Sequence, residues 1–377
     1  MPTTSTLPHQ VSDPVNARIL AVSEDGIQGF HRDPLKSIAT ASGLDLDTVV
    51  CRICAMLEAG TIRRVRQTLL TTSLAPGALV AWNVPDEKLN GAFDFMSRED
   101  PFSGHVVIRS TDTPAAGSGY RLWTTLKVPV EYSMDAHCAF LARQTGARAY
   151  KLLPAKKLFA LGVGHVRRRD LEPGSRTPEP GRELDVQLVH LTEAQWRVLM
   201  VLKREFTPSE IRPGLWNARA REAGLAPGEF FRIAQELEDQ NVMGRFSTFL
   251  EHVKKHRDGS VVTRYNALFH WAVPPGQEIA AGREVGRHHI MTHAYWREGG
   301  PEFSNVNVMG VAHGTDKARV LVHKAAIDTH LEEAGIAIGY TNVFWGGRSE
   351  IKPSEISPIA YRDWCVHVGL DPEAMRA

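Results

Sequence analysis

The pattern of apolar and polar positions predicts helices first and a sheet afterwards. Apolar residues recur at helical spacing over Pro34–Ala41 and again from Asp47 to Ala59, with the turn Ser42–Leu44 between them. Asp47 is the expected N-cap of the second helix, and Gly60 follows it at the position that a C-terminal glycine favours. A strand-like wing, Thr61–Val65, comes next. Two helices, a tight turn and a wing predict a winged helix-turn-helix.

The following stretch alternates between strand and helix periodicity. The predicted order is βαββαβ, which is typical of a ferredoxin-like domain, and the same order returns in the second half after helices over Leu191–Phe206 and Gly228–Gln240. The predicted segments are Ala78–Val84, Lys88–Met96, His105–Ile108, Leu122–Val128, Ser133–Thr145 and Lys156–Val163, and then Ala267–Val273, Ile279–Val285, His289–His293, Asn305–Val311, Lys317–Glu333 and Ile336–Phe344.

Short sequences also recur between the halves. Ala78-Leu-Val-Ala-Trp-Asn-Val-Pro85 returns as Ala267-Leu-Phe-His-Trp-Ala-Val-Pro274, and Ser42-Gly-Leu44 returns as Ala223-Gly-Leu225. His105–Arg109 likewise matches His289–His293. The three offsets lie between 181 and 189 residues and keep their order, which indicates a tandem duplication.

The predicted fold class is therefore α+β. Each half is expected to be a winged helix-turn-helix followed by a ferredoxin-like βαββαβ domain, and the two halves are expected to form an intramolecular pseudo-dimer. The Pro- and Gly-rich segment Glu172–Gly181 marks the seam. The predicted boundaries are a flexible tail over 1–14, winged units over 15–74 and 185–260, αβ domains over 75–171 and 261–377, and a linker over 172–184.

Composition restricts the class of protein. The 377 residues carry 44 Lys+Arg and 43 Asp+Glu, a net charge of +1, with no basic excess that would mark a dedicated nucleic-acid binder. Four cysteines are too few for a disulfide scaffold, and no apolar run reaches the length of a membrane span. We expect a cytoplasmic protein without a membrane segment, since the first residues lack the pattern of a signal peptide.

Several motifs, in this order and in both halves, resemble one family. A winged unit followed by βαββαβ is similar to the Lrp/AsnC-like regulators, and the fused form with these motifs resembles the siroheme decarboxylases of the haem d1 and alternative haem pathways. The motifs are Gly60-Thr-Ile-Arg-Arg64, Val84-Pro85, Leu153-Pro-Ala-Lys-Lys-Leu-Phe159, Thr292-His-Ala-Tyr-Trp-Arg297 and Val311-Ala-His-Gly314.

The chain departs from the family pattern at three places. Glu302-Phe-Ser-Asn-Val-Asn307 stands where the family has a Trp-Pro-Tyr-Asn-like run, and Trp345-Gly-Gly-Arg348 replaces a Phe-Lys pair. Arg109 of the first half corresponds to His293 of the second. These departures bear on which tetrapyrrole is bound and on which substituents of its ring are decarboxylated.

The resemblance implies a carboxy-lyase that removes CO2 from ring acetates of siroheme. The conjugated macrocycle delocalises the electrons left by CO2, so no cofactor beyond the iron tetrapyrrole substrate is expected, and no protein metal site. The protein must hold the ring, neutralise the remaining carboxylates and supply a proton. Histidine suits the proton transfer near neutral pH, and arginine suits the bidentate binding of a carboxylate.

His293, Tyr295 and Arg297 are the first candidates for catalysis. They alternate along a predicted strand, so their side chains share one face. We expect His293 to donate the proton, Arg297 to clamp a carboxylate and Tyr295 to position one. His313, before the small Gly314, is expected to be a second donor or an iron ligand.

The substrate-binding candidates are mainly cationic or aromatic. They are Arg64, His105, Arg109, Arg121, Trp123, Lys127, Arg245 and Asn307. Arg109, Arg121 and Lys127 lie on predicted strands of the first half, which lacks the His-x-Tyr pattern, so this half is expected to support a catalytic second half.

Two other functions compete with catalysis. An Lrp-type DNA-binding regulator would need basic recognition helices, but the two predicted helices offer Arg52 and Arg232 among apolar or acidic neighbours, which makes DNA binding the second choice. A tetrapyrrole sensor would bind the ring without a proton donor. The active form is expected to be either a monomer that is itself a pseudo-dimer, or a homodimer.

Overall fold

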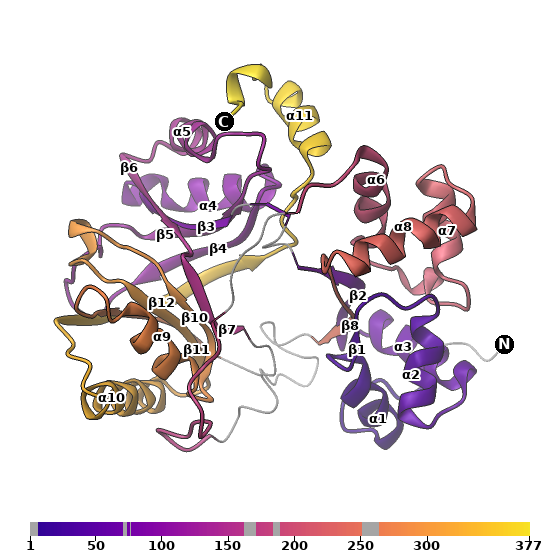
Figure 1. Cartoon of the computed structure of the whole chain (residues 1–377), viewed down its shortest axis with the longest axis horizontal. Coiled ribbons are helices and arrows are strands. Elements are labelled where there is room, and N and C mark those ends of the chain that lie inside the picture. Colours follow the sequence, from indigo (N-terminus) through magenta and orange to yellow (C-terminus); the bar gives the residue numbers. More distant parts are fainter. Residues whose placement is uncertain (1–6, 71–73, 76, 162–170, 184–188, 251–263) are drawn as a thin grey trace. The chain divides into compact units, whose positions relative to one another are not determined.

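The computed structural model describes residues 7–70, 74–75, 77–161, 171–183, 189–250 and 264–377 (Figure 1). The chain forms two compact units, and each of them draws on both halves of the sequence. Unit 1 comprises Met1–Leu74 and Leu188–Val261, and unit 2 comprises Ala75–Gln187 and Val262–Ala377. In the described part, no helix has the length and apolar character needed to cross a membrane.

Unit 1 contains two sets of helices, each followed by a long strand. The first set is α1 (Pro14–Ser23), α2 (Pro34–Ser42) and α3 (Leu46–Glu58), with β1 (Ile27–Gln28) and β2 (Ile62–Leu69). The second set is α6 (Glu193–Leu202), α7 (Trp216–Glu222) and α8 (Pro227–Asp239), with β8 (Met243–Leu250). Strand β8 pairs antiparallel with both β1 and β2, so one small sheet joins the two sets.

Helix α3 begins earlier than the sequence pattern predicted. Asp45, in the extended conformation, caps the helix, and its carboxylate accepts a hydrogen bond from the Thr48 backbone N–H at 2.8 Å. The predicted cap, Asp47, lies inside the first turn instead. The turn before the helix contains Gly43 at φ 66°, a left-handed conformation that glycine adopts without strain.

We expect Asp45→Ala to destabilise unit 1 by about 1 kcal/mol, because the substitution removes an N-cap acceptor. Asp47→Ala is the matched control and is expected to change stability by less than about 0.5 kcal/mol. Urea denaturation followed by circular dichroism measures both values. Equal losses in the two variants would show that the Asp45 cap contributes nothing specific.

Unit 2 contains two successive βαββαβ segments around one sheet. The first segment is β3 (Gly77–Asn83), α4 (Leu89–Arg98), β4 (Ser103–Ser110), β5 (Leu122–Lys127), α5 (Met134–Thr145) and β6 (Ala149–Pro154). The second is β9 (Tyr265–Ala272), α9 (Glu278–Gly286), β10 (Met291–Trp296), β11 (Val308–Gly314), α10 (Lys317–Glu333) and β12 (Tyr340–Ile351). Strand β7 (Lys157–Leu161) lies between the two segments in sequence, and α11 (Pro358–His367) follows the second.

All described strands of unit 2 pair antiparallel, in the order β6-β3-β5-β4-β12-β9-β11-β10-β7. Within each segment the last strand neighbours the first, and the third lies between the first and the second. The two segments join where β12 pairs with β4, from Trp345 opposite Ser110 to Ile351 opposite His105. Unit 2 is thus a mixed α+β structure with one continuous antiparallel sheet.

The sheet curls on itself. Strands β6 and β7 stand at opposite ends of the strand order, yet only two residues, Ala155 and Lys156, separate them in the chain. So short a connection requires the two edges to meet. Lys156 N–H donates to the Trp296 carbonyl at 2.9 Å, which fastens this connection to β10. One face of the sheet is therefore turned inward.

Three groups of buried side chains distinguish the two faces. On the outer face, Trp82 and Val106 pack with α4, α5 and α11, while Phe269 and Trp271 pack with the elements α9 and α10 of the second segment. The inner face has its own core. That inner cluster comprises Ala81, Val107, Trp123, Leu153, Leu268, Phe303, Val306, Met309 and Phe344.

Two elements of unit 2 were not predicted. Lys156–Val163 was expected to be the last strand of the first segment, but that position belongs to β6, and the predicted segment forms β7 on the far edge as far as Leu161. Residues 162 and 163 lie outside the described part. Helix α11 was missed because its apolar residues, such as Trp364 and Cys365, form only a short stripe near the chain end.

Candidate functional site

The inner face of the curled sheet gathers most of the predicted site residues. Residues two apart on a strand share a face, so the members of the inner cluster identify which polar neighbours point inward. The predicted residues on this face are His105 and Arg109 of β4, Trp123 and Lys127 of β5, His293 and Tyr295 of β10, and His313 of β11.

His293, Tyr295 and Arg297 form a continuous stack. The rings of His293 and Tyr295 are parallel within 10°, with centroids 6.0 Å apart, and the Arg297 guanidinium carbon lies 4.4 Å from the centroid of the Tyr295 ring. Arg297 also donates a hydrogen bond to the Leu153 carbonyl of β6. Burial raises the pKa of Tyr295, which keeps the phenol protonated. The strand thus places an imidazole, a phenol hydroxyl and a guanidinium in a row.

The side chain of Arg109 is buried on the same inner face of the sheet. Its side chain is 4% exposed, and its Nη1 donates to the Phe344 carbonyl at 3.3 Å. Burial lowers the pKa of Arg109 to about 9, which still leaves the guanidinium charged at neutral pH. His105 is nearby, and its pKa falls to about 3 because of burial and then the charges of Arg109 and His293. His105 is therefore a neutral hydrogen-bonding group, and its Nε2 lies 3.0 Å from Ser349 Oγ.

Lys127 and Arg297 add further positive charge. Burial, and then the neighbouring Arg297, lower the pKa of Lys127 to about 8. In the described part of the chain, Arg109, Lys127 and Arg297 form no ion pair with a carboxylate. Buried or partly buried cations without counter-ions are unfavourable in the free protein. The inner face thus carries positive charge that an anion with several negative charges would balance.

His313 of β11 also lies on the inner face, opposite Asn266 of β9. Its Nε2 lies 3.4 Å from Asn266 Nδ2. The same register row continues through Gly346 of β12 to Arg109 of β4.

Four predicted binding residues have other surroundings. Arg121 forms an ion pair with Asp86 at 2.7 Å, and Asn307 uses its amide to bind both backbone groups of Val273. Arg64 and Arg245 belong to unit 1. Arg64 lies 3.2 Å from a Glu205 carboxylate oxygen, and Arg245 donates to the Glu24 carbonyl. Because the amide of Asn307 is used to bind the backbone of Val273, Asn307 has a structural role that its sequence position did not reveal.

The sequence pattern missed His270. This residue of β9 is fully buried among Trp123, Phe303 and Phe344, on the inner face. A signal was available, because the second copy of the repeat has His270 where the first copy has Ala81.

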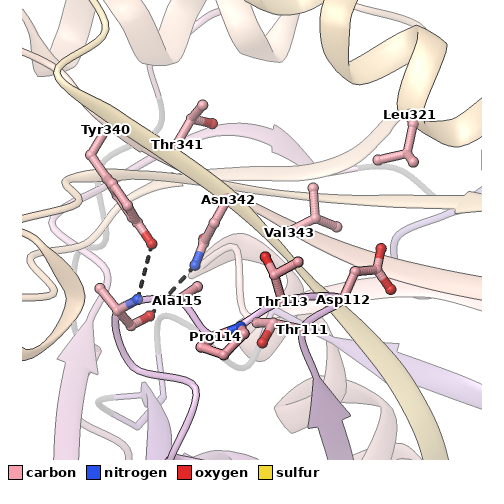
Figure 2. Close-up of a pocket in the computed structure, with 11 residues that line it drawn as sticks. Thr111, Asp112, Thr113, Pro114, Ala115, Leu321, Tyr340, Thr341, Asn342 and Val343 are labelled. Atoms are coloured by element: carbon pink, nitrogen blue, oxygen red, sulfur yellow. Dashed lines mark hydrogen bonds between the residues drawn. The ribbon is translucent and has the colours of Figure 1, made fainter.

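A surface pocket of about 720 Å³ lies elsewhere on unit 2 (Figure 2). The segment Thr111–Ala116 and the start of β12, Tyr340–Val343, line it together with Leu321. Tyr340 and Asn342 point toward the loop in Figure 2, and Tyr340 Oη accepts a hydrogen bond from Ala116 N–H at 3.1 Å. None of the predicted site residues lines this pocket.

The described residues contain no group of three or more His, Cys, Asp or Glu side chains arranged to hold a metal ion. The adjacent His288 and His289 differ in burial: His288 is buried, and His289 is exposed.

One family model matches part of unit 2. Residues 75–160 match the family model of the AsnC-like ligand binding domain, which fits the Lrp/AsnC-like superfamily. A search of curated proteins finds no significant match.

Solved structures resemble nearly the whole chain. The crystal structure of the siroheme decarboxylase NirDL shares 18% identity at a TM-score of 0.65, over 94% of this chain and 98% of that chain. The structure of NirDL in complex with an iron-uroporphyrin III analogue shares 17% identity at the same TM-score, over 94% and 99%. At these identities the likeness concerns the fold, and at that level the predicted resemblance to siroheme decarboxylases is confirmed.

Proposed function

We propose that this chain is a siroheme decarboxylase whose substrate carboxylates bind within the curled sheet of unit 2. The observation that carries the proposal is the set of inward cations Arg109, Lys127 and Arg297, none of which has an acidic partner in the described part, beside the His293–Tyr295 stack. A tetrapyrrole with carboxylates around its rim supplies the missing negative charge. The product would be didecarboxysiroheme, or its singly decarboxylated precursor.

The chemistry requires one bond to break and one to form. The bond between an acetate methylene and its carboxylate carbon breaks, CO2 leaves, and the electron pair is delocalised into the macrocycle. Protonated His293 then transfers its proton to the methylene carbon, which becomes a methyl group, and solvent reprotonates the imidazole. Arg297 and Tyr295 hold the adjacent carboxylate, and Arg109 and Lys127 neutralise others. The iron belongs to the substrate.

We also propose that the chain arose by tandem duplication of a winged helix-turn-helix joined to a ferredoxin-like domain. The repeated strand order of unit 2 and the two helix sets of unit 1 support this interpretation. Gly43 and Gly224, which match in the sequence repeat, adopt φ angles of 66° and 70° at equivalent turns. The resulting molecule would be an intramolecular pseudo-dimer.

The environment of the predicted recognition helices supports catalysis over DNA binding. Arg52 of α3 is engaged by the Pro8 carbonyl at 3.1 Å and by Asp13 at 3.3 Å. Arg232 of α8 pairs with Glu236 on the same helix. Basic side chains that already have acidic partners are poorly placed to contact phosphates.

Anaerobic incubation of the purified protein with siroheme tests the proposal. We expect the mass of the tetrapyrrole to decrease by successive losses of CO2. Siroheme that binds but keeps its mass would favour a sensor, and an unchanged mass together with tight, sequence-specific DNA binding would favour a regulator.

The affinity for a polycarboxylate should fall as the pH rises through about 8. Lys127 has a lowered pKa of about 8, so the cation present below that pH is lost above it, whereas the ligand carboxylates stay ionised throughout. Absorbance titrations with iron uroporphyrin between about pH 6.5 and 9.5 measure the change. Lys127→Met should bind more weakly and show a flatter profile; a profile identical to that of the native chain would exclude Lys127 as the titrating group.

A further inference from the structure

His270 has an unusual environment for a polar side chain. Its solvent exposure is 0%, and neither ring nitrogen has a hydrogen-bond partner among the residues that the structure describes. Its ring packs instead against Phe344 at 5.0 Å, Trp123 at 6.0 Å and Phe303 at 6.1 Å between centroids. A leucine or phenylalanine at this place would avoid the cost of burying two unsatisfied nitrogens. The imidazole is therefore better explained by a ligand that supplies a partner.

Arg109 approaches the same corner of the inner face. It donates a hydrogen bond to the carbonyl of Phe344, the residue whose ring contacts His270, and its own Nε is buried with no partner in the described ranges of the chain. The Arg109 charge also contributes to the low pKa of His270, about 3, after burial. His270 is therefore neutral, with one N–H to donate. A guanidinium and an imidazole N–H together suit one carboxylate.

Phe303 fills the space beside this pair. Its fully buried ring comes from the loop between β10 and β11 and packs against Trp123 at 5.6 Å and Tyr120 at 5.1 Å. The next two residues, Ser304 and Asn305, have φ angles of 51° and 55°, a conformation that non-glycine residues seldom adopt. Such consecutive left-handed residues store strain that a rearranged loop would release.

We propose that Arg109 and His270 form a carboxylate subsite inside the curled sheet, and that the Phe303 ring occupies its mouth when no ligand is bound. The subsite takes a carboxylate carried on a planar, aromatic body, because Trp123 and Phe344 flank the volume that Phe303 fills. That this carboxylate belongs to siroheme rests on the function proposed above; the subsite itself does not.

Removing the Phe303 ring tests the subsite with a small probe. In Phe303→Ala, benzoate should bind at least about tenfold more tightly than benzyl alcohol, which has the same ring without the charge. In Phe303→Ala combined with His270→Leu or Arg109→Met, the preference for benzoate should disappear. Isothermal calorimetry measures each affinity. Equal binding of benzoate and benzyl alcohol to Phe303→Ala would overturn the proposal.

A second variant keeps the test decisive if Phe303→Ala does not fold. His270→Leu removes the unsatisfied nitrogens, so its melting temperature should equal or exceed that of the native chain, while its affinity for iron uroporphyrin should fall by about tenfold. A more stable variant with unchanged affinity would assign His270 to the core and overturn the proposal. If benzoate binds as expected but siroheme is neither bound nor decarboxylated, the subsite stands and the proposed function fails.

Discussion

Replacing His293 with alanine is expected to slow CO2 release from siroheme by about 10²- to 10⁴-fold, the usual contribution of a general acid. Binding should persist, because Arg109, Lys127 and Arg297 still provide the positive charge on the inner face. Single-turnover measurements under anaerobic conditions separate the two quantities. The dissociation constant comes from absorbance changes of the macrocycle, and the rate comes from the mass of the product.

His289→Ala is the matched control for this experiment. His289 is exposed and lies four residues before His293, so its loss should leave both rate and affinity unchanged. If His293→Ala retained the native rate, another group would have to supply the proton, and His313 would be the next candidate on the inner face. Loss of binding without a change in the rate on bound substrate would assign His293 to recognition instead.

Asp100→Ala is expected to reduce the free energy of unfolding of unit 2 by about 3–5 kcal/mol, because it breaks a buried polar cluster. The fully buried Asp100 accepts hydrogen bonds from Ser103 Oγ at 2.6 Å and Phe102 N–H at 3.0 Å. Its Oδ1 lies 3.4 Å from His137 Nε2, and His137 Nδ1 lies 3.0 Å from Tyr361 Oη. The cluster joins Ser103 of β4 and His137 of α5 to Tyr361 of α11, and His137 and Tyr361 are 224 residues apart in the chain.

The effect of Asp100→Ala should depend on pH in a defined direction. Burial opposes ionisation of Asp100, but His137 and the hydrogen bonds outweigh it and hold the pKa of Asp100 below its usual range. The stabilisation is therefore present above the unfolded-state pKa of aspartate and is lost as pH falls through the lower folded-state value. Chemical denaturation of variant and native chain should converge in acid. The exposed Asp135→Ala is the control, and a loss of equal size there would contradict the role of the cluster.

The sequence pattern predicted most elements of unit 2 because each obeys a local rule. β9 is a short apolar run of strand length, and α10 is a 17-residue stretch without Gly or Pro, so their positions needed no long-range information. The cap at Asp45 was missed by two residues because Asp45 and Asp47 are both acceptable caps, and only backbone geometry decides between them. The closure of the sheet between β6 and β7 depends on tertiary packing, which no local pattern encodes.

The candidate site was partly predictable for the same reason. Strand alternation correctly placed His293 and Tyr295 on one face, since that geometry is local. It did not indicate that Asn307 binds the backbone of Val273, or that His270 is enclosed by rings from three other elements. Those contacts depend on strand pairing and on side-chain packing between separate elements, which no local pattern encodes.

The central claim is that cations on the inner face of unit 2 bind the carboxylates of the tetrapyrrole. The most direct measurement is the dissociation constant of siroheme for Arg109→Met/Lys127→Met, compared with Arg98→Met/Arg362→Met, whose side chains are exposed. The account predicts an increase of about 100-fold or more for the first pair and little change for the second. Native affinity in Arg109→Met/Lys127→Met, with the fold intact, would contradict it.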